Sequence, residues 1–404
     1  MPRHEGCAAS GVPWRESTAA ARNDGAVKLG LAGGALCVIG GIAVLAGVLP
    51  ASDLAVIAER VWPVLLFVVA ATIVAELAAV AGLFDLVAER LARAARGRTW
   101  LLWLLVLVLA TVTTVFLSLD TTAVLLTPVV VTMARQHRLD PLPFAFVTVV
   151  LANTASLVLP VSNLTNLLAA ERAGVTDPWR FLTLLGPSAA IAIVVSAVVL
   201  TVVFLPRLPR RHEPAAPPEV SDPVLLRVAG VVVAVLLPLL VIGIAPWIPA
   251  LAAAAVLGAA FLWRAPRTIR PTLIPWSLLL FAGGLFVVVG AAEQLGLGVL
   301  TAALVGQESV WQVAGAGVVA ANAVNNLPAF LALESAAGGG ERLAALLVGV
   351  NAGPLLTPWA SLATLLWHGR LKAAGVEIRW TRFVLLGMVV APLTVAAAVL
   401  PLAL

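Results

Sequence analysis

Long apolar runs that carry at most one charge constrain the fold of this sequence more than any other feature. About 20 apolar residues span the hydrocarbon core of a bilayer as a helix, and most of the runs reach that length. Hydrophobic residues make up 61% of the 404 residues and charged residues only 11%, which excludes a soluble globular or a disordered chain. We therefore predict an all-α polytopic membrane protein. The runs lie at 29–50, 61–83, 99–119, 121–134, 141–170, 181–205, 228–263, 271–292, 309–333, 343–367 and 383–404.

Arginine and lysine residues predict the orientation, because cytoplasmic loops are enriched in them. Placing their clusters in the cytoplasm predicts a multi-pass protein of the cell inner membrane, with a cytoplasmic tail at 1–28 and the C-terminus outside. The run 228–263 contains a Pro-rich turn and is divided into two helices, so about nine spans result. We attribute the net charge of +5 to cytoplasmic anchoring and expect no nucleic-acid partner. The clusters lie at 1–28, 90–98, 135–138, 207–227, 264–270 and 370–382.

The stretch 99–134 has basic residues at both ends and predicts two helices joined at a polar tip, Ser-Leu-Asp-Thr-Thr, at 118–122. Two interpretations compete. The stretch is either an ordinary pair of spans with a periplasmic loop, or a re-entrant hairpin whose tip stops inside the membrane. A five-residue tip without a turn glycine favours the hairpin. A second hairpin is predicted at 309–335, with Asn325-Asn326 at its tip.

Three sequence features of the first half recur in the second and predict an internal repeat. Trp62-Pro-Val-Leu-Leu-Phe matches Trp276-Ser-Leu-Leu-Leu-Phe, and the tip at Asp120 matches Asn325. Asn153 followed by a proline seven residues later matches Asn351 in the same way, at an offset of 198. The predicted repeats cover 29–205 and 223–404, with a Pro-rich cytoplasmic linker at 206–222. Their predicted directions are opposite, and inverted repeats with matching helix breaks are typical of secondary transporters.

Polar residues inside the apolar runs predict the site. Asp120 is a carboxylate between long apolar runs, and such a group pairs, binds a cation or holds a proton; the alternative is a helix cap at a wet tip. Pro160 breaks the predicted helix 141–170, and Pro354 and Pro358 break the helix 343–367, which exposes backbone groups near the midplane. The alternative is that these polar groups only join helices. The candidate substrate-binding residues are Thr121, Thr122, Asn153, Ser162, Asn163, Thr165, Asn166, Asn325, Asn326, Asn351, Ser361 and Thr364.

Other chemistry is not indicated. The four histidines are scattered, the two cysteines cannot form a metal cluster, and no glycine-rich ATP loop or catalytic constellation occurs, so we expect no metal, no cofactor and no enzyme activity. Glu76 is interpreted as an interfacial residue, and Glu293 and Glu334 receive no functional role. The predicted site segments contain no lysine or arginine, which favours a neutral or weakly charged substrate.

Four stretches resemble the arsenical pump membrane protein family of the ion transporter superfamily, which is related to sodium/dicarboxylate symporters. They are FLSLDTTAVLLTPVVVTM, NTASLVLPVSNLTNLL, NNLPAF and GPLLTPWASLATLLW. The resemblance implies two re-entrant hairpins and two broken helices around a central site. It also implies efflux of arsenite or antimonite, driven by the proton motive force or by a separate ATPase subunit, from a homodimer that works by an elevator motion.

The sequence departs from the dicarboxylate branch of that superfamily. The tips carry Leu-Asp-Thr-Thr and Val-Asn-Asn-Leu-Pro, where the dicarboxylate branch has Ser-Asn-Thr. We therefore predict proton-driven arsenite or antimonite efflux with Asp120 as the coupling residue. Two alternatives remain open at this point: a sodium-coupled carboxylate or sodium/proton transporter of the same fold, and a non-transporting membrane scaffold subunit.

Overall fold

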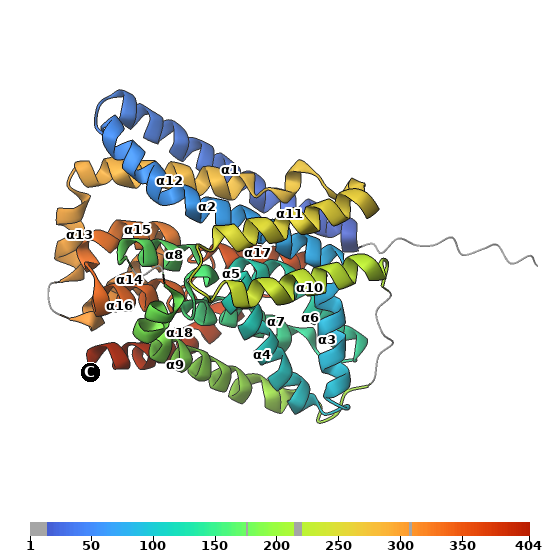
Figure 1. The fold of residues 1–404 in the computed structure, drawn as a ribbon. Coiled ribbons are helices and arrows are strands. Elements are labelled where there is room, and N and C mark those ends of the chain that lie inside the picture. The colour runs from blue at the N-terminus through green and yellow to red at the C-terminus, as the bar shows by residue number, and fades with distance from the viewer. Residues whose placement is uncertain (1–13, 175–176, 214–219, 307–308) are drawn as a thin grey trace, which may run out of the picture.

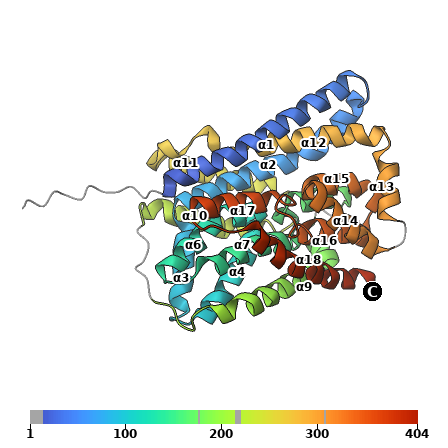
Figure 2. The same ribbon diagram turned by 180° about the vertical axis from the view of Figure 1, so that it is seen from behind.

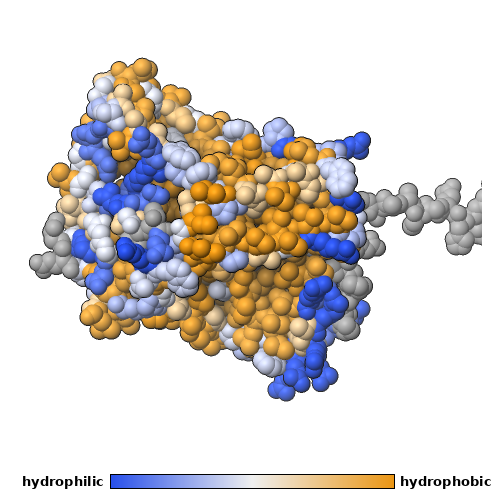
Figure 3. All heavy atoms as spheres, in the orientation of Figure 1, coloured by the Kyte–Doolittle hydropathy of each residue, from blue (hydrophilic) through white to orange (hydrophobic). Residues whose placement is uncertain are grey.

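The computed structural model describes residues 14–174, 177–213, 220–306 and 309–404, and every named element in these ranges is a helix. The prediction of an all-α protein is confirmed. Figure 1 shows long helices running side by side, with the start of α1 and the C-terminus at opposite ends of the molecule. Apolar side chains cover a broad band of the surface between polar groups at both ends (Figure 3). Such a band is what a protein surrounded by lipid requires.

Five helices form one layer of the molecule, which we call the outer layer (Figures 1 and 2). α1 packs along α12, and α2 packs against α11 and α12. Glycines allow the close approach of α1 and α12, since a Cβ on Gly40 would lie 2.7 Å from Val287. Small residues at helix contacts are a common packing device in membranes. The helices are α1 (Trp14–Leu45), α2 (Ala51–Val80), α10 (Pro223–Leu239), α11 (Trp247–Arg264) and α12 (Trp276–Gln294).

Two interrupted helical pairs form the inner layer. In the first half, α4 (Thr99–Leu117) ends at Ser118, and the chain returns through α5 (Leu119–Thr121), a π-helical turn and α6 (Thr127–Gln136). α7 (Pro141–Thr154) then breaks around Pro160, and α8 (Leu164–Arg172) follows. In the second half, α14 (Val310–Val324) and α15 (Asn326–Ala337) meet at Asn325, and α16 (Gly340–Ala352) is separated by a break from α17 (Leu362–Ala373).

Two long helices, α9 (Pro178–Phe204) and α18 (Trp380–Ala403), pack against each other and against the inner layer. The chain also forms α3 (Leu83–Ala94) and α13 (Leu297–Val305). Six helices of the described ranges are long and apolar enough to cross a membrane: α2, α4, α9, α11, α12 and α18. Four shorter apolar helices accompany them. The count of nine spans and the division into repeats stay predictions.

Two boundaries differ from those expected. α1 begins at Trp14, so the second half of the predicted tail 1–28 is helical, whereas residues 1–13 lie outside the described residues. The hairpin tips also align differently. Ser118 and Asn325 each follow the last residue of the first helix, and both have a left-handed φ, of 88° and 110°. By this geometry Ser118 is the counterpart of Asn325, so Asp120 has no equivalent acidic residue in the second half.

Candidate functional site

The tip of the first hairpin lies on the break of the first broken helix. Ser162 Oγ donates to the carbonyl of Val115 at 2.7 Å, and Thr122 Oγ1 lies 2.9 Å from Thr114 Oγ1. Ser118 Oγ accepts from the backbone of Thr121. These bonds satisfy backbone and hydroxyl groups that the two interruptions leave open. The predicted residues Thr121, Thr122 and Ser162 are therefore close together.

The second hairpin meets the second break in a similar way. Asn325 Nδ2 donates to the carbonyl of Trp359 at 2.9 Å, and the backbone N–H of Asn326 donates to the carbonyl of Ala360 at 2.8 Å. Asn322, one turn earlier, donates to Gly353 at 3.0 Å. Each tip is thus fixed to the break of its own half. The Asn325 amide and the Asn326 backbone bond to this break, whereas the Asn326 side-chain oxygen accepts from the backbone of Leu327 at 2.9 Å.

Asn351 joins the two breaks. Its Oδ1 accepts from Asn163 Nδ2 at 2.8 Å and from Thr165 Oγ1 at 3.0 Å, and its Nδ2 donates to Asn166 Oδ1 at 2.8 Å. Asn166 Nδ2 donates in turn to the carbonyls of Ser156 and Leu159. All four of these asparagine and threonine side chains are buried. A buried polar network that is satisfied in this way positions backbone rigidly, so Asn351 acts as a cross-link between the halves.

Three other predicted residues have buried polar atoms without a hydrogen-bond partner in the described chain. They are Asn153 Oδ1, Ser361 Oγ and Thr364 Oγ1. Asn153 Nδ2 donates to the carbonyl of Val149 in its own helix, at 2.8 Å. An unsatisfied buried polar atom costs about 1–3 kcal/mol, so these three positions differ in kind from the closed network at Asn351.

A cavity of about 450 Å³ lies between the outer layer and the inner layer. Its inner wall includes Asp120, Thr121 and Asn163. The outer wall comes from the C-terminal half of α2, from Val27 and Leu29 in the middle of α1, and from the chain leading into α12. Most of the lining is apolar, with a few polar groups, which is the usual character of a small-molecule site.

The Asp120 carboxylate faces this cavity and forms no hydrogen bond or ion pair within the part of the chain that the structure describes. Glu76 and Arg370 also line the cavity, although Glu76 was interpreted as interfacial and Arg370 as part of a cytoplasmic cluster. The predicted segments themselves contain no basic residue, but Arg370, just beyond the segment 343–367, lies on the cavity wall. α17 carries Arg370 past the end of the predicted segment and turns it inward.

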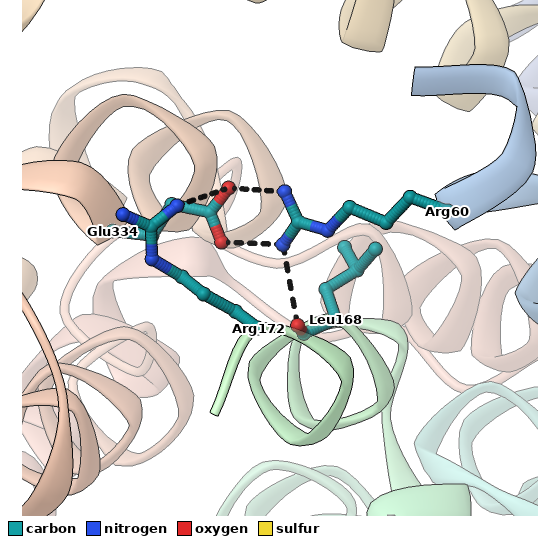
Figure 4. Close-up of polar contacts among 4 residues, drawn as sticks. All are labelled: Arg60, Leu168, Arg172 and Glu334. Atoms are coloured by element: carbon teal, nitrogen blue, oxygen red, sulfur yellow. Dashed lines mark hydrogen bonds and ion pairs between the residues drawn. The ribbon is translucent and has the colours of Figure 1, made fainter. Parts of the chain in front are cut away.

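A buried ion cluster was missed by the sequence reasoning (Figure 4). Arg60 of α2 forms two hydrogen bonds of 2.8 Å with Glu334 of α15, and it donates to the carbonyl of Leu168 in α8 at 3.2 Å. Arg172 lies 3.9 Å from the same carboxylate. The Glu334 side chain is only 5% exposed. The cluster connects the outer layer to the second hairpin and the first broken helix, and nothing in the local sequence of Glu334 indicates this pairing.

Comparisons with known proteins identify the family of this chain. The model of the citrate transporter family (CitMHS) matches residues 26–348. The chain belongs to this citrate transporter family. It is also 27% identical over 381 residues to the arsenical pump membrane protein of Escherichia coli K12, covering 86% of this chain and 87% of that protein. The arsenical pump membrane protein of Yersinia enterocolitica is 27% identical over 382 residues, with the same coverage.

As a member of this family and of the ion transporter superfamily, the chain is a multi-pass membrane transporter. The YdaH transporter of Alcanivorax borkumensis has a similar fold, with a TM-score of 0.58 over 94% of this chain and 97% of that chain. At 16% sequence identity, this likeness concerns the fold alone. In the described residues no group of three or more His, Cys, Asp or Glu side chains is placed to hold a metal ion.

Proposed function

We propose that this transporter exports arsenite or antimonite across the cytoplasmic membrane, driven by the proton motive force. The observation that carries the proposal is the Asp120 carboxylate, which faces the cavity at a helix interruption without a cationic partner in the described residues. A carboxylate in such a place takes up and releases a proton more readily than one held in an ion pair. The names of the arsenical pump relatives support the choice of substrate.

Arsenite is mainly a neutral trihydroxide at neutral pH, and a neutral solute suits a cavity that is mostly apolar with few polar groups. With the N-terminus in the cytoplasm, as the basic clusters predict, the cavity faces the cytoplasm because it adjoins Val27 and Leu29, at the cytoplasmic end of the predicted span 29–50. In that orientation the cavity is the loading side for efflux. A homodimer and a separate ATPase subunit are further parts of the proposal, tested by cross-linking and by co-purification.

The test uses everted membrane vesicles that accumulate arsenite when acidified inside. We expect uptake to be abolished by a protonophore, indifferent to sodium, and reduced at least about tenfold by Asp120→Asn. The matched control is Asp53→Asn, because Asp53 is a partly exposed carboxylate at the start of α2, bonded to Gln294 and away from the cavity. Unchanged rate and pH dependence in Asp120→Asn would show that Asp120 is not the coupling residue.

A second candidate is sodium-coupled carboxylate transport. Arg370 lines the cavity and offers a planar donor group that binds carboxylates, and the family model is described as a citrate transporter. Sodium-dependent uptake of citrate or succinate by reconstituted protein, lost in Arg370→Gln, together with no arsenite uptake, would favour this function.

A further inference from the structure

The three unpartnered atoms of Asn153, Ser361 and Thr364 come from two helices that pack against each other, α7 and α17. All three side chains are at most 1% exposed. They lie behind the wall of the cavity, since Leu362 and Leu366 of α17 line it whereas Ser361 and Thr364 do not. These residues therefore form a group separate from the Asp120 side of the site.

Two hydrogen bonds fix the relative direction of α7 and α17. Arg135, in the last turn of α6 just before α7, donates to the carbonyl of Ala374 at the end of α17, at 2.6 Å. Trp367, in the middle of α17, donates to the carbonyl of Ala145 near the start of α7, at 2.8 Å. The end of α17 thus lies beside the start of α7. The two helices are antiparallel, so the start of α17 lies toward the end of α7.

Helix geometry then places Asn153 and Ser361 at nearly the same level, with Thr364 about one helical turn from Ser361. Asn153 follows Ala145 by eight residues, about 12 Å along α7 at 1.5 Å per residue. Ser361 precedes Trp367 by six residues, about 9 Å along α17 in the same direction, and Thr364 is half as far. Asn153 and Ser361 are therefore within roughly one helical turn of each other along the shared axis.

In the equivalent contact of the other half, the polar side chains bond directly to one another. At the predicted repeat offset of 198, Asn351 corresponds to Asn153, Asn163 to Ser361, and Asn166 to Thr364. Asn351 bonds directly to both Asn163 and Asn166. A serine or threonine in place of asparagine shortens the side chain and removes an amide donor. The second contact cannot repeat the direct bridge, and this explains why all three of its polar atoms are left without partners.

We propose that Asn153, Ser361 and Thr364 form a buried subsite for a small neutral solute that carries several hydroxyl groups. The Asn153 Oδ1 atom only accepts hydrogen bonds, while the two hydroxyls both donate and accept. A neutral trihydroxide offers three donors and three acceptors, so it satisfies all three atoms. A carboxylate has no proton to offer Asn153 Oδ1. This subsite rests on the proposed function, for which it identifies the atoms that recognise arsenite.

The experiment measures the rise in unfolding temperature that arsenite produces in the purified full-length protein, because a ligand that binds only the folded state stabilises it. We expect Ser361→Ala and Thr364→Val each to weaken arsenite binding about tenfold, as loss of one buried hydrogen bond predicts. The unfolding temperature without ligand stays the same or rises, since each change removes an unpartnered hydroxyl. The control is Ser196→Ala, whose buried hydroxyl bonds Thr394 between α9 and α18, at 3.2 Å.

A more decisive test is the double variant Ser361→Asn with Thr364→Asn, which copies the asparagines at positions 163 and 166 that bond directly to Asn351. We expect it to raise the unfolding temperature and to abolish arsenite binding, a combination that simple damage to the fold does not produce. Wild-type affinity in Ser361→Ala and Thr364→Val would overturn the subsite. The same result accompanied by a lower unfolding temperature would identify these atoms as a site for structural water only.

Boric acid, another small neutral trihydroxide, separates failure of the subsite from failure of the proposed function. Wild-type protein that binds boric acid but does not transport arsenite, with boric acid binding lost in Ser361→Ala, would support the subsite and reject arsenite efflux. Wild-type protein that binds neither compound would overturn both.

Discussion

The Arg60–Glu334 pair offers a quantitative test of how the two layers are held together. Arg60 is 27% exposed at its side chain and Glu334 only 5%. Removing one partner of a buried pair strands the other charge, at a cost of about 3–5 kcal/mol. Arg60→Met strands the carboxylate, which stays buried with only Arg172, 3.9 Å away. Glu334→Gln strands an arginine that water reaches in part, so we expect the smaller cost, about 1–3 kcal/mol.

The assay is a double-mutant cycle on the free energy of unfolding in mixed detergent micelles. If Arg60 and Glu334 are each other's main partners, the double variant loses less stability than the two single variants added together. The expected coupling free energy is at least about 1.5 kcal/mol. Arg138 and Glu213 provide the control, because they form an ion pair of 3.2 Å with 77% and 60% exposed side chains. Exposed pairs couple by about 0–1 kcal/mol. Additive costs at Arg60 and Glu334 would refute the view that this pair fastens the layers.

Two further predictions concern packing and pH. A Cβ at Gly387 of α18 would overlap the carbonyl oxygen of Leu355 in the second break. We therefore expect Gly387→Ala to destabilise the protein by about 1–3 kcal/mol, whereas Gly186→Ala, with open space around it, leaves the unfolding temperature unchanged. Equal changes in stability in Gly387→Ala and Gly186→Ala would argue against close packing of α18 on the second break. Burial and the nearby His137 lower the pKa of His212, whose ring lies 5.0 Å from that of His137. The unfolded chain then binds a proton at higher pH than the folded chain, so this group makes stability fall as pH drops below about 6.5. We expect His212→Gln to lose less stability than wild type between pH 7.5 and 5.5, and an identical loss would show that His212 does not contribute.

Much of the fold follows from local sequence, because helix breaks have local causes. Pro160 removes a backbone donor wherever it stands, so the interruption after α7 is predictable without tertiary information. The tip at Asp120 is marked by a polar residue between apolar runs, and the structure does interrupt the helix there, at Ser118. The exact residue at the turn was not predictable, since a left-handed serine needs support from its surroundings.

The partners of polar side chains could not be predicted in the same way. Glu334 and Arg60 are 274 residues apart in the sequence, and the packing of both α15 and α2 on α8 brings them together. Asn351 was predicted to bind substrate, yet its amide is occupied by residues of the other half. Arg370 lies just beyond an apolar run, and its direction depends on how α17 packs. In each case the sequence reveals a polar group, whereas its partner depends on contacts between distant segments.

The bridge at Asn351 has a mechanical consequence. Each hairpin is fastened to the break beside it, and one amide then fastens the two breaks to each other. A displacement of either hairpin would therefore act on the opposite half through a few hydrogen bonds. We expect the inner layer to move as one rigid block. The cavity lies on the seam between that block and the outer layer. A displacement of the block along this seam would change the size of the opening while the polar network inside the block keeps its shape.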